Sequence, residues 1–200
     1  MAAKVKSKPK KAKKAKMKLK VKTGKVKASL KQKSAARKGV PEGFSTVTPH
    51  LNVRDAARAL DFYKRAFGAV ETVRMPGPGG KILHAEIKIG DSHVFLADEM
   101  PEWGSRSPLT IGGTATALCL YVDDADAVFN QAVAAGAQVK MPLADQFWGD
   151  RYGKLADPFG HEWAVATHLE DLTPAEMERR REVAMAQMGQ RPQTHPGSPT

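Results

Sequence analysis

An internal repeat is the feature that most constrains how this 200-residue chain can fold. In each copy an aspartate follows an apolar, β-branched segment, and a glycine follows an amphipathic segment. Asp55 and Gly68 are 13 positions apart in the first copy, and Asp124 and Gly136 are 12 positions apart in the second. Because aspartate is a preferred helix N-cap and glycine a preferred C-terminal stop, each copy predicts a strand, a helix and then further strands.

The predicted elements follow the same order in both copies. The first copy holds a strand at 44–53, a helix at 56–68, and strands at 70–75, 82–89 and 93–98. The second copy holds a strand at 114–122, a helix at 125–136, and strands at 137–143, about 150–156 and 161–168. Leu60, Tyr63 and Phe67 give the first helix one apolar stripe. We therefore expect an α+β fold in which two βαβββ modules form cupped mixed sheets with the helices outside.

The positive charge of the chain is concentrated in its first 40 residues. That segment holds 16 Lys, one Arg and no acidic residue, so it carries +17, whereas residues 41–200 carry −6. Such dense like charge, with little apolar surface to bury, predicts a disordered tail at 1–40. The rest is predicted to comprise a domain at 41–172, with modules at 44–98 and 114–170 joined by a turn-rich linker at 99–113. Residues 173–200 are expected to form a short charged helix at 173–188 and a disordered end.

Two interpretations of the tail remain open. One is an electrostatic arm that binds nucleic acid or another polyanion, and the other is a solubilising extension without a partner. The first aromatic residue of the chain is Phe44, so the tail offers no side chain on which bases could stack. Any nucleic-acid binding by residues 1–40 is therefore expected to be non-specific and sensitive to salt.

The remaining composition favours a cytoplasmic protein. Cys119 is the single cysteine, which excludes an internal disulfide and suits a reducing compartment. Its apolar neighbours predict a buried side chain. No apolar run approaches 18 residues, so no membrane-spanning segment is expected, and the basic N-terminus lacks the apolar segment of a secretory signal.

Several short motifs resemble those of the vicinal oxygen chelate superfamily. They are the Val-x-Asp of each module, Asp-Phe-Tyr at 61–63, Phe-Gly-Ala at 67–69 and Asp-Pro-Phe-Gly at 157–160. This superfamily includes glyoxalase I, extradiol dioxygenases, fosfomycin-resistance enzymes and bleomycin-binding proteins. The segment Phe-Trp-Gly-Asp-Arg-Tyr-Gly at 147–153, with Pro-Glu-Trp-Gly at 101–104, is similar to the PhnB-like branch.

The resemblance implies four positions for metal ligands. In metal-dependent members, four side chains on the concave faces of the sheets, usually His and Glu, hold one divalent ion. Alignment of the strands places these positions at Thr48, His84, Ala117 and Ala164. A methyl group has no lone pair, so only His84 is a good ligand among the four. A divalent site normally needs three or more protein ligands, and the inherited site is therefore expected to be dismantled.

Alternation along the strands predicts the cup-facing residues independently. In the first module it selects Thr48, His50, Asn52, His84, Glu86 and Lys88, and it buries Val47 under the helix. In the second module it selects Ala117, Cys119, Tyr121, Glu162, Ala164, Ala166 and His168. A shifted site for zinc, nickel or iron, formed by His50, His84, Glu86 and Glu162, stays open as an alternative. His93 and His161 have the opposite parity and are expected to be structural or exposed.

Loop aromatic and arginine side chains complete the candidate site, because such residues commonly line ligand pockets. The candidate ligand-binding residues are His50, His84, Glu86, Trp103, Tyr121, Trp148, Arg151 and Glu162. Phe159 and Tyr152 are further loop aromatics. A ligand wall and a loop-packing cluster fit these two residues equally well, and the same two alternatives apply to Trp103, Trp148 and Arg151.

Three functions fit these observations. The first is binding of an aromatic or cationic small molecule without a metal, as bleomycin-binding members do. The second is a metal-dependent lyase, transferase or dioxygenase, in which the ion polarises substrate oxygens. The third is a nucleic-acid-associated protein localised by its tail. A homodimer is expected by analogy with the superfamily.

Overall fold

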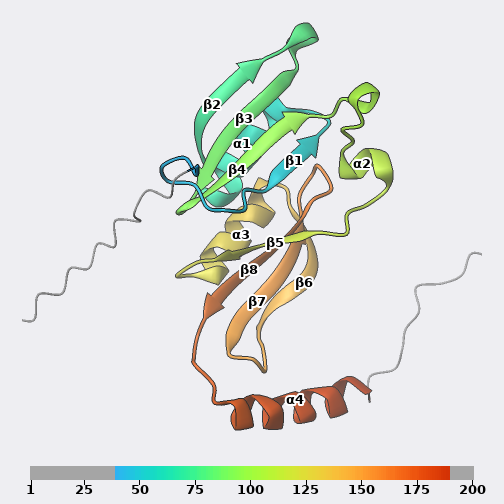
Figure 1. Ribbon diagram of the computed structural model, residues 1–200. Coiled ribbons are helices and arrows are strands. Elements are labelled where there is room, and N and C mark those ends of the chain that lie inside the picture. The colour runs from blue at the N-terminus through green and yellow to red at the C-terminus, as the bar shows by residue number, and fades with distance from the viewer. Residues whose placement is uncertain (1–38, 190–200) are drawn as a thin grey trace, which may run out of the picture. The chain divides into compact units, whose positions relative to one another are not determined.

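The computed structural model describes residues 39–189 as two four-stranded mixed sheets with helices (Figure 1). The predicted tail at 1–40 lies almost wholly outside the described residues, as does most of the predicted disordered end. No helix within the described range is long and apolar enough to cross a membrane. The expected α+β fold with two βαβββ modules is confirmed.

The first module follows the predicted order. Its elements are β1 (His50–Val53), α1 (Ala56–Phe67), β2 (Val70–Pro76), β3 (Ile82–Ile89) and β4 (Ser92–Asp98). The sheet has the order β1-β4-β3-β2, in which β1 runs parallel to β4 and the other pairs are antiparallel. Helix α1 begins where the Asp55 side chain accepts a hydrogen bond from the Arg58 amide at 3.0 Å. It ends at Gly68, whose φ of 64° favours glycine.

The second module repeats this arrangement. Its elements are β5 (Ala117–Tyr121), α3 (Ala125–Ala135), β6 (Gln138–Asp145), β7 (Asp150–Ala156) and β8 (Glu162–His168), in the sheet order β5-β8-β7-β6. The linker contains a 3-10 turn at Pro101–Trp103 and the short helix α2 (Pro108–Ile111). Another 3-10 turn, Pro78–Gly80, joins β2 to β3, and α4 (Pro174–Gly189) follows the second module.

The first strand of each module is shorter than predicted. β1 begins only at His50 and β5 only at Ala117, and the Val47 side chain is 79% exposed rather than packed under the helix. The parallel partner of β5 explains its start, because Ala117 pairs with Glu162, the first residue of β8. In the first module, Pro49 has no amide hydrogen with which to extend the ladder. Phe44 instead stacks on His93, with ring centroids 4.0 Å apart.

A buried aspartate joins the two modules. Asp157 belongs to the turn between β7 and β8, and its Oδ2 accepts hydrogen bonds from Tyr63 Oη of α1 at 2.7 Å and Trp163 Nε1 of β8 at 2.9 Å. Its Oδ1 accepts the amides of Phe159 and His161, both at 2.9 Å. Burial, followed by the charge of Asp157, raises the Tyr63 pKa well above its ordinary value. The Asp-Pro-Phe-Gly turn is therefore a lock between modules as well as a hairpin turn.

Aromatic packing continues this contact between modules. Phe67 of α1 lies 4.8 Å from Trp163 between ring centroids, and Phe62 lies 6.0 Å from Phe159. Gln131 of α3 donates to the carbonyl of Arg65 at 2.8 Å. Phe159 is thus buried in a structural cluster, which decides between the two interpretations of this loop aromatic. The helices and the inner faces of both sheets share one core.

Candidate functional site

The face of each sheet turned away from the shared core carries most of the predicted site residues, and we call it the open face. On the first sheet, alternation places Leu51 in the core and leaves His50 on the open face. Ala85 and Ile87 are likewise buried, whereas His84 and Glu86 beside them are only half-buried. The predicted cup-facing parity of β1 and β3 is therefore confirmed.

The first open face brings together His50, His84 and Glu86 around Phe95 of β4. The ring centroids of His50 and His84 are 6.3 Å apart, and those of His84 and Phe95 are 4.9 Å apart. His84 Nε2 lies 3.3 Å from Glu86 Oε1. Burial and the neighbouring His84 lower the His50 pKa, so the neutral imidazole is favoured near neutral pH.

The four positions at which the superfamily places metal ligands do not provide a ligand set. Ala117 and Ala164 lie on the open face of the second sheet, where Ala164 is in register with Cys119 and Ala117 with Glu162. Neither alanine has a donor atom. Among residues 39–189, no group of three or more His, Cys, Asp and Glu side chains is arranged to hold a metal. Of the four positions, only His84 carries a side chain that is a strong metal ligand.

The second open face is organised by the buried carboxylate of Asp150, which is only 5% exposed. Tyr121 Oη of β5 and Trp148 Nε1 each donate to Asp150 Oδ2 at 3.0 Å. His168 Nδ1 of β8 lies 2.8 Å from Asp150 Oδ1, and its Nε2 lies 3.1 Å from Asp171 Oδ1. One carboxylate therefore fixes three side chains from different segments.

These contacts shift the pKa of each titratable partner. Burial opposes ionisation of Asp150, but the hydrogen bonds from His168, Tyr121 and Trp148 outweigh it and lower the Asp150 pKa. Hydrogen bonds to Asp150 and Asp171 raise the His168 pKa. The hydrogen bond to Asp150 raises the Tyr121 pKa. Relative to the isolated side chains, the contacts thus favour the ionised form of Asp150, the charged form of His168 and the neutral form of Tyr121.

A tight turn positions Trp148 and Asp150 at the start of β7. The Gln146 amide donates to the Asp150 carbonyl at 2.8 Å, and Gly149 has a φ of 95°. A Cβ at Gly149 would lie 2.6 Å from the Glu170 carbonyl oxygen, so another residue here would displace the backbone. This explains the glycine of the Phe-Trp-Gly-Asp motif.

Aromatic rings form the wall of the second open face and alanines its floor. The ring centroids of Trp148 and Tyr152 are 5.6 Å apart, and the Tyr121 side chain is 65% exposed. Ala166 lies in register between Tyr121 and Tyr152. Cys119 is on this face, and its exposed side chain contradicts the prediction of burial. Among the described strands, β5 is an edge strand that pairs only with β8, which sequence pattern alone did not reveal.

Two predicted site residues lie apart from these groups. Arg151 has the opposite parity to Asp150, and its guanidinium pairs with Asp126 of α3 at 2.7 Å and with Asp145 of β6 at 2.9 Å. Trp103 is 74% exposed in the linker turn. Among the described residues, it makes no ring contact with another aromatic side chain. Arg151 is thus engaged in surface ion pairs, and Trp103 is separate from the aromatic wall.

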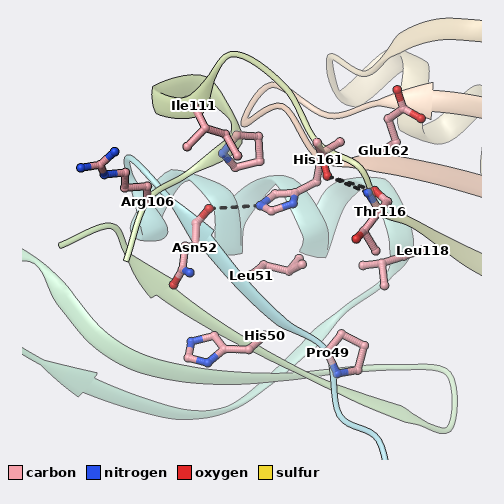
Figure 2. Close-up of a pocket in the computed structure, with 12 residues that line it drawn as sticks. Pro49, His50, Leu51, Asn52, Arg106, Ile111, Thr116, Leu118, His161 and Glu162 are labelled. Atoms are coloured by element: carbon pink, nitrogen blue, oxygen red, sulfur yellow. Dashed lines mark hydrogen bonds between the residues drawn. The ribbon is translucent and has the colours of Figure 1, made fainter. Parts of the chain in front are cut away.

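A cavity of about 280 Å³ lies where β1, the linker and the starts of β5 and β8 meet (Figure 2). We call it the seam pocket. His50 and Glu162, both predicted site residues, line it. His161 also lines it, with Nε2 3.1 Å from the Asn52 carbonyl oxygen. Alternation along the strand predicts that His161 is structural or exposed. The turn at Asp157 directs the His161 side chain toward β1. Alternation along a strand does not predict this direction.

Comparison with known proteins agrees with this architecture. The family model of the Glyoxalase/Bleomycin resistance protein/Dioxygenase superfamily matches residues 44–165. An uncharacterized protein of Mycobacterium bovis is 46% identical over 135 residues, which cover 66% of this chain and 89% of that protein.

Solved structures also match. TioX from Micromonospora sp. ML1 is 31% identical, with a TM-score of 0.50 over 62% of this chain and 99% of that chain. A gene product of Arabidopsis thaliana is 29% identical, with a TM-score of 0.51 over 62% of this chain and 98% of that chain. The chain belongs to the glyoxalase/bleomycin resistance protein/dioxygenase superfamily.

Proposed function

We propose that this protein binds an aromatic, positively charged small molecule on its open faces without the full metal site of the superfamily. The main support for this proposal is the arrangement of side chains on the second open face. There, a buried carboxylate, Asp150, lies among the rings of Tyr121, Trp148 and Tyr152. Aromatic faces attract cations. The Asp150 carboxylate adds attraction of the same sign, which His168 partly offsets when its imidazole is charged.

The charges on this face support the same proposal. Ala164 and Ala166 lie beneath the aromatic side chains and are almost fully covered, so we expect the ligand to contact the rings rather than the sheet. Lys154, two positions beyond Tyr152 on β7, is in register with Ala164 and places a positive charge on the same face. We therefore expect the cationic group of the ligand to lie at the Asp150 end. The net charge of −6 on residues 41–200 also favours a basic ligand.

Metal-dependent chemistry is the competing function. It would require a divalent ion held by His84, with His50, Glu86 or Glu162 supplying further ligands, to act as a Lewis acid on substrate oxygens. The alanines at positions 117 and 164 remove two of the four ligands that the superfamily pattern provides. This chain would then need a shifted ligand set.

A matched pair of probes tests the proposal. 9-Aminoacridine is cationic near neutral pH and acridine is largely neutral, so quenching of tryptophan fluorescence by each compound compares ligands of similar shape. We expect 9-aminoacridine to bind at least about ten-fold more tightly, a difference of about 1.4 kcal/mol. Equal affinity for the two compounds, or no saturable quenching by either, would contradict the proposal.

Three variants locate the binding. Tyr121→Ala removes an exposed ring from the wall, and Asp150→Asn removes the negative charge while it keeps the shape. We expect Tyr121→Ala to weaken the binding of both probes. We expect Asp150→Asn to remove the preference for the cationic probe. Trp103→Ala is the matched control, because it removes an exposed aromatic side chain outside the aromatic wall. If only Trp103→Ala reduces binding, the ligand lies at the linker and not on the second open face.

A further inference from the structure

The seam pocket contains polar side chains that the protein leaves without partners. Within the described part of the chain, four lining groups make no hydrogen bond or ion pair: the Arg106 guanidinium, the Asn52 amide, the Thr116 hydroxyl and the Glu162 carboxylate. The only polar contact of Asn52 inside the pocket uses its backbone carbonyl, which lies beside His161. Proteins generally satisfy such groups internally or leave them for water and ligands.

Arg106 differs in this respect from other arginines of the domain. Arg74 binds both oxygens of Glu71, and Arg180 binds both Glu170 and Glu176. Arg106 has no such carboxylate, although Glu162 lines the same pocket. The two charged groups are not within ion-pair distance of each other among the described contacts. A cation and an anion are therefore both available to a ligand.

The two charges lie at different ends of the pocket lining. Figure 2 shows Arg106, from the linker, on one side of the view and Glu162, from β8, on the other, with Asn52 and His161 in between. The apolar part of the lining comes from Leu51, Leu118 and Ile111. The pocket thus presents a positive end, an apolar and neutral polar middle, and a negative end.

We propose that the seam pocket binds a small zwitterion, with an anionic group at Arg106, an ammonium group at Glu162 and a short apolar chain between them. A simple anion would leave Glu162 uncompensated, and a simple cation would leave Arg106 uncompensated. A dipolar molecule neutralises both. The volume of about 280 Å³ is at the lower end for ligand pockets, which suits a molecule smaller than a typical drug.

The other polar groups of the pocket are compatible with this ligand class. Asn52 and Thr116 supply neutral hydrogen-bonding groups that can orient either end. His50 adds little positive charge near neutral pH, because burial and His84 lower its pKa. The pocket therefore keeps one full positive and one full negative charge. The proposal uses residues distinct from the aromatic wall, so it does not depend on the function proposed above.

Nuclear magnetic resonance titration of the full-length, ¹⁵N-labelled chain provides the test. The probes are 4-aminobutanoate, 5-aminopentanoate and 6-aminohexanoate, which separate the two charges by increasing lengths. Hexanoate and hexylamine carry one charge each and serve as controls. We expect at least one amino acid of the series to bind at least about five-fold more tightly than either control, with shifts at 51–52, 106, 116–118 and 161–162. Equal affinity for the controls, no binding, or shifts confined to other residues would overturn the proposal.

Charge-removing variants identify the two ends of the site. Arg106→Gln should weaken binding of the zwitterion at least about five-fold and leave the affinity for hexylamine unchanged. Glu162→Gln should weaken binding of the zwitterion to a similar degree and leave the affinity for hexanoate unchanged. Arg58→Gln and Glu182→Gln remove the same charges from exposed helix positions outside the pocket and should have no effect. If the pocket variants behave like these controls, the proposal is wrong.

Within residues 39–189, the side chains of Arg106 and Glu162 make no hydrogen bond or ion pair, so we expect both variants to retain a dispersed amide spectrum. Titration of the same samples with 9-aminoacridine separates the two proposals. Loss of zwitterion binding with retained 9-aminoacridine binding supports a distinct seam site. Parallel loss of both would assign the effect to one shared site and overturn the inference.

Discussion

At the scale of single residues, Asp150 has the largest organising role on the second open face. Its two oxygens hold side chains from β5, from the turn before β7 and from the end of β8. These contacts stabilise the ionised carboxylate against the cost of its burial. The orientation of Tyr121 and Trp148 therefore depends on one negative charge that has little exposure to solvent.

This arrangement predicts an unusual pH dependence for His168. Its raised pKa means that the charged imidazole stabilises the folded state at pH values below about 6.5, its unfolded pKa. That contribution is lost as the pH rises through the higher folded pKa. We expect the melting temperature to fall more in His168→Gln at about pH 6 than at about pH 9.

A second histidine provides the control for this measurement. Burial lowers the His50 pKa, so its neutral form is favoured in the folded state and its contribution diminishes as the pH falls. The stability difference between the wild type and His50→Gln should therefore change with pH in the opposite direction. Parallel trends for the two variants in scanning calorimetry would contradict the assigned interactions.

Sequence reasoning identified some of these residues and missed others for physical reasons. Tyr121 was predicted from the alternation along its strand, and Trp148 because aromatic side chains near loops commonly line sites. Asp150 was missed, because acidic residues are mostly exposed and no periodic pattern distinguishes a buried one. Its three hydrogen-bond partners lie up to 29 positions away from it in the sequence. Such a network becomes visible only when the strands are paired.

At the scale of secondary-structure elements, the helices and the inner strands were predicted closely. α1 ends at Phe67 before Gly68, and β3 spans Ile82–Ile89 as expected. These elements have local signals: capping residues, an apolar stripe and a clean alternation. The first strand of each module was predicted too long, because its extent depends on a parallel partner far away in the sequence. The local sequence therefore does not determine the residue at which the first strand of each module begins.

The turn between β7 and β8 leads to a prediction about stability. Asp157→Ala would leave the buried Tyr63 hydroxyl and Trp163 indole N–H without an acceptor. We expect the free energy of unfolding to fall by about 3–5 kcal/mol in urea denaturation. Tyr63→Phe removes one donor and leaves the others, so a loss of about 1–2 kcal/mol is expected.

The matched control is Tyr121→Phe, which removes a phenol that also binds an aspartate but is 65% exposed. We expect a loss below about 1 kcal/mol, because water can replace the lost donor. If Tyr63→Phe is no more destabilising than Tyr121→Phe, the contact between Tyr63 and Asp157 does not act as the lock between modules.

At the scale of the whole molecule, the open faces remain uncovered in a single chain. Exposed apolar side chains lie on the open face of the first sheet along β2, at Val70, Val73 and Met75. We propose that a second copy covers part of this surface, as a homodimer would do, because apolar patches of this kind commonly mark interfaces. Light scattering at micromolar concentration tests this directly, and a monomeric mass would contradict it.

The basic tail is a separate proposal at this scale. Residues 1–40 carry +17 and the rest of the chain carries −6, so nucleic-acid binding should depend on the tail alone. We expect deletion of residues 1–40 to abolish retention on immobilised duplex DNA at low salt. Retention of the full chain should decline steeply as salt increases. Unchanged retention after deletion would exclude the tail as the cause.

We propose that this member of the superfamily binds its small-molecule ligand without a metal. Measurement of the dissociation constant of 9-aminoacridine tests this, for protein treated with a chelator and for the same protein supplied with zinc, nickel or iron(II). We expect equal dissociation constants, with no change on His84→Ala. Loss of binding on chelation, restored by one equivalent of metal and dependent on His84, would contradict it.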